Sequence, residues 1–121
     1  MNKGAVQSKS FAFAVRIVNL YKFLTLEKKE YVIAKQLLRS GTAIGALVRE
    51  ADQAESKADF VHKMSIGLKE ANETSYWLEL LHETKYLEST AFSSIHADVL
   101  ELLRLLTSII KSTKQAIARD G

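Results

Sequence analysis

The 121-residue sequence contains no cysteine and no proline, and it has only five glycines. A chain without cysteine forms neither disulfides nor thiolate metal sites. All-β folds use proline and glycine freely in their turns, so the scarcity of both residues favours helices. No stretch of about 18 apolar residues is present, and residues 1–11 lack the apolar core of a signal peptide. We therefore expect a cytoplasmic protein with no membrane partner.

The remaining composition is typical of one globular domain. Hydrophobic residues make up 47% and charged residues 26% of the chain, proportions that fit a folded protein and not a disordered one. The length fits one domain, and we assign residues 1–121 to it. The formal net charge of +3 is a mild basic bias, smaller than that of a dedicated nucleic-acid-binding domain.

Apolar residues recur at helical spacing in four segments, at about residues 10–26, 29–54, 57–84 and 92–118. Ser56 before the third segment, with Asp59 three positions later, has the form of a capping box. The connections are short, so successive helices should run in opposite directions. The sequence therefore predicts an all-α fold, an antiparallel up-down four-helix bundle.

Small residues repeat every four positions in two of these segments. Gly41 and Gly45 lie in segment 29–54, and Gly67 is followed by Ala71 and Ser75 in segment 57–84. A glycine inside a helix costs about 1 kcal/mol relative to alanine, and close approach of a second helix could offset that cost. We expect the two ridges of small residues to face each other and to bring the second and third helices unusually close.

Three of the four predicted helices carry apolar residues on more than one face. In the first, Phe11, Val15 and Val18 follow one helical line, and a second line contains Phe13 and Ile17. A helix of a monomeric bundle needs an apolar arc of only about 100°. A wide core is one interpretation of the surplus. The other is a homo-oligomer, whose interface residues we predict as Phe13, Ile66, Trp77 and Leu81.

Cations follow one line of the second predicted helix. Lys28, Lys35, Arg39 and Arg49 share this line, which contains no acid, and such a row could track the phosphates of a nucleic acid. The alternative is a solvated face whose arginines pair with the next helix. The antiparallel register places Arg39 near Glu73, so we expect a structural ion pair between them.

No pattern of a catalytic or cofactor site is present. The chain lacks a glycine-rich phosphate loop, a nucleophile elbow and a dinucleotide fingerprint. Its three histidines are not spaced as ligands on one helix face, and Glu79 with His82 gives a single Glu-x-x-His where a di-metal bundle needs two. We expect a protein that is not an enzyme and has no metal or other cofactor.

Two segments resemble a known family. Residues 37–45, LLRSGTAIG, and residues 60–81, FVHKMSIGLKEANETSYWLELL, are similar to the four-helix-bundle proteins named after the intervening sequences of bacterial 23S rRNA genes. The resemblance implies an antiparallel bundle that assembles as a ring, usually a pentamer. It also implies a fold similar to the accessory proteins of diversity-generating retroelements, which bind nucleic acid and a reverse transcriptase. The family supplies no catalytic residues.

These observations lead to two hypotheses of function. The first is a homo-oligomeric helical binding module whose partner is RNA or a ribonucleoprotein. The second is a protein-only scaffold or adaptor, in which the row of cations is ordinary solvated surface. Salt-sensitive binding to RNA distinguishes the two.

Overall fold

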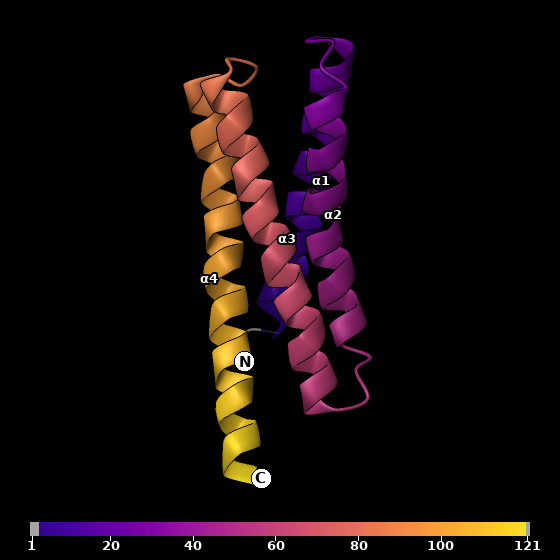
Figure 1. Cartoon of the computed structure of the whole chain (residues 1–121), viewed down its shortest axis with the longest axis vertical. Helices are drawn as coiled ribbons and strands as arrows, with labels where there is room; N and C mark the ends of the chain where they lie inside the picture. The colour runs from indigo at the N-terminus through magenta and orange to yellow at the C-terminus, as the bar shows by residue number, and fades with distance from the viewer. Residues whose placement is uncertain (1–2, 121) are drawn as a thin grey trace.

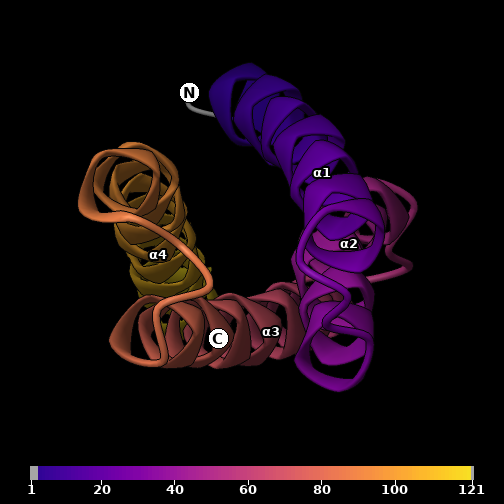
Figure 2. The same ribbon diagram turned by 90° about the horizontal axis from the view of Figure 1, so that it is seen from above.

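The computed structural model describes residues 3–120, which form four helices (Figure 1). They are α1 (Lys3–Leu26), α2 (Val32–Ala51), α3 (Lys57–Glu83) and α4 (Ser89–Asp120). Seen from above, the helices follow one another in chain order around a common axis (Figure 2). Each helix packs against the next in the chain, and α1 meets α4. The predicted all-α four-helix bundle is confirmed. Within residues 3–120, no helix is long and apolar enough to cross a lipid bilayer.

The contacts between α2 and α3 show that these helices are antiparallel. The hydroxyl groups of Thr74 and Ser40 share a hydrogen bond of 2.9 Å, whereas Leu47, further along α2, lies opposite Gly67, earlier on α3. Both hydroxyl groups are buried, and Thr74 also donates to the Glu70 carbonyl group over 2.7 Å. The pair therefore satisfies its own polar groups inside the interface and fixes the register of the two helices.

The helix ends differ from the predicted ones where side chains or backbone angles intervene. The first helix begins at Lys3 and not near residue 10, because Val6 already packs into the core. The second begins at Val32 and not near residue 29, because Lys29 has a left-handed backbone with φ of 56°. The third begins as predicted: Ser56 accepts the Asp59 amide over 3.0 Å.

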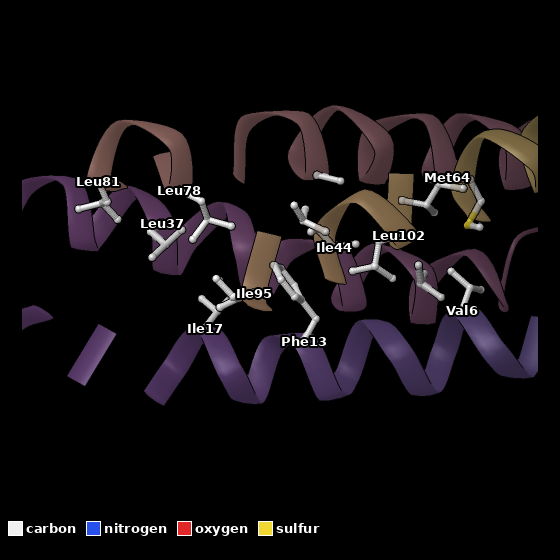
Figure 3. Packing of buried hydrophobic residues seen from close by; sticks show 14 of the residues in the cluster. Val6, Phe13, Ile17, Leu37, Ile44, Met64, Leu78, Leu81, Ile95 and Leu102 are labelled. Carbon is white, nitrogen blue, oxygen red and sulfur yellow. The ribbon is translucent and has the colours of Figure 1, made fainter. Parts of the chain in front are cut away.

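The core lies along the bundle axis and receives side chains from all four helices (Figure 3). Its largest fully buried members are Phe13, Ile17, Leu24, Leu37, Ile44, Met64, Leu78, Leu81, Leu102 and Leu106. Burying one such side chain stabilises the fold by about 1.5–3 kcal/mol. On α1, the buried line is therefore the one that contains Phe13 and Ile17, and the line of Phe11, Val15 and Val18 faces outward.

The glycines of α2 face α1, so the prediction that they face the third helix is wrong. A Cβ atom on Gly41 would lie 2.8 Å from two carbons of Ile17, and one on Gly45 would lie 3.2 Å from the Ser10 carbonyl oxygen. Spacing identifies a small-residue ridge but not the neighbour that it meets. Gly67 does face α2. A Cβ atom added there would lie 3.7 Å from the Leu47 Cβ atom, which is an ordinary contact.

The contact between α1 and α4 is the least extensive of the four. Polar pairs reinforce it along its exposed side. Arg16 Nη1 lies 2.6 Å from Asp98 Oδ2 and Nη2 donates to Ser94 Oγ over 2.9 Å, while Lys9 Nζ lies 3.1 Å from Glu101 Oε2. Exposed pairs of this kind contribute at most about 1 kcal/mol each, so the buried side chains hold α1 against α4.

Candidate nucleic-acid interface

The predicted row of cations lies along one side of α2 and the loop before it. Lys28 belongs to the loop, and Lys35, Arg39 and Arg49 belong to α2; all four residues are exposed. The helix contains no acidic residue between Lys35 and Arg49. Lys35, Arg39 and Arg49 share one face of α2 because they are four and ten residues apart. Lys28 precedes α2 and the left-handed Lys29, so helical spacing does not place it on that face.

Arg39 is bound to two carboxylates of α3. Its Nη1 lies 3.1 Å from Glu70 Oε1, and its Nη2 donates to Glu73 Oε2. The predicted Arg39–Glu73 pair is therefore present, and Glu70 is a second partner that the register argument did not name. Because two negative groups balance this guanidinium group, Arg39 adds little net positive charge to the row.

The ion pair changes the pKa of both partners. The hydrogen bond from Arg39 lowers the pKa of the Glu73 carboxyl group, a hydrogen bond from Trp77 Nε1 over 2.9 Å lowers it further, and burial acts in the opposite direction. The same Arg39–Glu73 hydrogen bond is the main cause that raises the pKa of Arg39. Both groups are therefore charged at neutral pH, and the cluster orients the Trp77 ring.

Arg49 lies beside a hollow between α1 and α2. Its guanidinium carbon is 5.9 Å from the centre of the Phe11 ring, a cation–π arrangement that leaves the charge solvated. The hollow has a volume of about 480 Å³ and is lined by Phe11, Ala14, Gly45 and Arg49 among others. Gly45 lines this hollow, and a Cβ atom there would point toward the Ser10 backbone of α1.

More lysines lie at the end of the bundle that carries the α1–α2 and α3–α4 loops. The two loops enclose a hollow of about 370 Å³, called here the loop-end hollow. Its lining consists of Leu20, Phe23, Lys28, Lys85, Tyr86, Leu87, Glu88 and Ala91. Lys28 Nζ is 5.7 Å from the centre of the Phe23 ring. An up-down bundle has its first and third loops at the same end. The predicted topology therefore already implied that Lys28 and Lys85 lie at one end, an implication that the sequence-based prediction did not draw.

Each of these loops contains a lysine with a left-handed backbone, Lys29 at φ of 56° and Lys85 at φ of 69°. After α3, the Lys85 amide donates to the His82 carbonyl group over 3.1 Å, and the Tyr86 amide donates to the Leu81 carbonyl group over 2.9 Å. This is the Schellman ending, whose left-handed position is usually glycine. Lysine at that position has a steric cost that glycine avoids.

Two of the four predicted interface residues are wrong. Phe13 and Leu81 have exposed fractions of 1% and 0%, because the other helices of the same chain cover them, so neither is available to a second copy. Ile66 and Trp77 are partly exposed, and their role stays a prediction. Trp77 also packs edge-on against Tyr76, with 5.0 Å between ring centres.

Exposed apolar side chains occur on several helices, as at Val32 and Tyr76, and three of those on α1 form a line. Phe11 is 59% exposed, Val15 is 47% exposed and Val18 is 36% exposed, and the spacing of four and three residues puts them on one line. We call these three residues the α1 ridge. This apolar line is recognisable in the sequence, but hydrophobicity alone does not show which of the two lines of α1 faces the core.

Two of the three histidines, His82 and His96, pack as aromatic rings. Phe92 stacks between His82 and His96, with ring centres 4.3 and 4.7 Å apart. The Nε2 atom of His96 also lies 3.0 Å from Ser75 Oγ and 3.5 Å from Glu79 Oε2. Among residues 3–120, no three histidine, aspartate or glutamate side chains are grouped as a metal site would require.

The chain matches one family model, and its fold is similar to that of a protein of known structure. The model of the family described as 23S rRNA-intervening sequence proteins matches residues 2–108. A crystal structure from Bacteroides thetaiotaomicron, described as a protein with unknown function from the S23 ribosomal protein family, is similar with a TM-score of 0.90. The two sequences are 59% identical, and the similarity covers 92% of this chain and 99% of that chain. No curated protein matches the chain.

Proposed function

The chain belongs to the 23S rRNA-intervening sequence protein family, and on this premise we propose that it is a non-enzymatic, homo-oligomeric module that binds RNA or an RNA–protein complex. The similar Bacteroides protein is itself described as having unknown function. The proposal therefore depends on the surface of this chain, and the observation that carries it is the exposed row of cations along α2.

Three members of the row support binding to phosphates. Lys28, Lys35 and Arg49 are exposed, and among the described residues none of them forms an ion pair. Arg39 is set apart because its carboxylate partners already balance its charge. Lysine and arginine side chains that contact phosphates release condensed counterions, which favours association at low salt.

The proposed assembly uses the α1 ridge as a contact for a second copy of the chain. Covering an exposed apolar line of this kind with another protein surface lowers the free energy of the assembly. A ring needs contacts between two different patches of neighbouring copies, and the family resemblance indicates a ring of five. Such a ring would repeat the row of cations once per subunit, and repeated weak contacts to one RNA strengthen the total binding.

The experiment compares two charge reversals in RNA binding. The probe is a structured RNA with paired and unpaired segments, titrated with the intact protein at low salt and again at increasing salt. The variant Lys28→Glu with Lys35→Glu should bind more weakly than the parent and with a smaller salt dependence. The matched control is Lys111→Glu with Lys114→Glu, which changes net charge equally on exposed positions of α4.

The two outcomes separate the candidate functions. Parent affinity that declines linearly on a log–log salt plot, and is reduced by the α2 reversal more than by the α4 reversal, supports the proposal. A parent that binds no RNA at low salt, or an α2 variant that binds as well as the parent, contradicts it. The protein-only scaffold then takes its place.

A further inference from the structure

Residues of the α1–α2 and α3–α4 connections line the loop-end hollow, and both connections are at the upper end of the bundle in Figure 1. We propose that this hollow binds single-stranded RNA, with phosphates at Lys28 and Lys85 and an unstacked base at the Phe23 ring. The inference rests on the proposed function and deepens it, because it names the form of RNA and adds Phe23 and Lys85 to the interface.

The first argument is the state of the cations at this end. Elsewhere, several cations are bound to carboxylates, as Arg16 is to Asp98 and Lys57 is to Asp120. At the loop end, no carboxylate lies within ion-pair distance among the described residues for any of Lys22, Lys28, Lys29, Lys35 and Lys85. Some exposed cations elsewhere, such as Arg49 and Lys111, also form no ion pair with a described residue, so the loop end differs in having several such lysines together. These ammonium groups are therefore free to meet the phosphates of a strand.

Four glutamates, Glu27, Glu30, Glu83 and Glu88, lie at the same end, and none of them forms an ion pair with a described residue. The Glu30 carboxylate accepts the amides of Ile33 and Ala34 over 3.2 and 2.8 Å, so it serves as the cap of α2. Glu88 lines the hollow and repels phosphate from its own side. The lysines from the two loops thus define the side of the hollow that an RNA backbone would approach.

The backbone of the loops gives an independent argument. Lys29 and Lys85 occupy left-handed positions, where glycine would be unstrained. Backbone strain that a fold retains is often found at functional sites. A strained lysine therefore indicates a function that needs its side chain, which glycine would not provide. The Schellman ending accounts for the left-handed backbone at Lys85 but not for the choice of lysine there. Lys29 is the neighbour of Lys28, which lines the hollow together with Lys85, so a shared task for the two loops would account for lysine at both strained positions.

The aromatic ring decides between single-stranded and paired RNA. Phe23 is 40% exposed and lines the hollow. The Lys28 ammonium group lies over this ring, 5.7 Å from its centre, so a stacked base would use the opposite face or displace that group. A base can stack on an exposed ring only if it is not already stacked inside a duplex. Alternating aromatic and cationic contacts are the usual means of holding a single strand without sequence preference.

The test uses the intact protein, a 12-nucleotide oligouridylate and a 12-base-pair RNA duplex, both fluorescently labelled and measured by anisotropy. Lys85→Gly should melt at or above the parent's temperature, because glycine relieves the left-handed backbone. It should nevertheless bind the oligouridylate about 5-fold more weakly at 0.1 M salt, with the log–log salt slope reduced by about 0.7. Phe23→Leu, which keeps apolar bulk, should weaken binding by about 5-fold with an unchanged slope.

The control variant is Lys111→Gln, which removes one exposed cation of α4 and should leave oligouridylate binding near the parent value. If the parent binds duplex as well as single strand, and Lys85→Gly and Phe23→Leu bind like the parent, the loop-end site is excluded while RNA binding by α2 stands. If the parent binds neither probe nor the structured RNA, the proposed function itself fails. Loss of binding together with a lowered melting temperature in Lys85→Gly would overturn the strain argument.

Discussion

Three glycines in helix contacts form a matched series that measures how closely α1 packs on α2. Replacing any of the three glycines with alanine gains about 1 kcal/mol of helix propensity. The space available to the new methyl group differs among the three positions. At Gly67, the methyl group would be 3.7 Å from Leu47, an ordinary contact, so Gly67→Ala should stabilise the protein by the full ~1 kcal/mol. At Gly45, the 3.2 Å approach to a backbone oxygen of α1 should cancel most of that gain.

Gly41→Ala should destabilise the protein. Its methyl group would lie 2.8 Å from two carbons of Ile17, a fully buried side chain whose branched Cβ leaves it little rotational freedom. Overpacking of this kind costs about 1–3 kcal/mol, so a cost near ~2 kcal/mol outweighs the propensity gain by ~1 kcal/mol. Gly41→Ala and Gly67→Ala should thus differ by ~2 kcal/mol, or roughly 8 °C in melting temperature.

Urea unfolding followed by circular dichroism, at one fixed protein concentration, measures this series because assembly would make stability depend on concentration. The expected order of stability is Gly67→Ala, then Gly45→Ala, then Gly41→Ala, with unchanged m values. Gly41→Leu should be less stable still. A Gly41→Ala variant as stable as Gly67→Ala would refute the close packing of Ile17 on α2.

Light scattering after size exclusion should give a mass several times 13.5 kDa. The double variant Phe11→Glu with Val15→Glu should reduce this mass to that of one chain without loss of helical signal. A parent protein that is monomeric at micromolar concentration would exclude the assembly. Glu73→Gln should lower stability at pH 7 by ~0.5 kcal/mol, the size of an exposed pair. Because folding lowers the Glu73 pKa, this contribution is complete above the usual glutamate pKa of about 4.3 and is lost as pH falls through the lowered value. Parent and variant melts that still differ by the same amount at about pH 2 would show that the charge is not the cause.

The sequence contains enough information for the helices and for one side-chain pair. Helical periodicity identified all four helices, and counting residues across the short connection between the second and third helices placed Arg39 beside Glu73. Ser56 was recognisable as an N-cap because its role depends only on nearby residues. These successes share a physical basis, since each depends on local spacing or on one short loop.

Choices between competing faces needed the structure. Phe11 and Phe13 are both aromatic and lie on apolar lines of α1, but only Phe13 is buried, because the arrangement of all four helices decides which line faces the axis. The same holds for Gly41, whose neighbour is α1 and not α3. Left-handed Lys29 and Lys85 carry no sequence signal, because lysine is not a residue that prefers this conformation.

An even number of antiparallel helices returns the chain to the side on which it started. The N-terminal end of α1 and the C-terminal end of α4 both point toward the lower end in Figure 1, away from the loop-end hollow. The 27 residues of α3 span about 40 Å along the bundle at 1.5 Å per residue. A tag at either terminus, or a sensor surface to which the protein is tethered through one, is therefore held roughly a helix length away from Lys28 and Lys85.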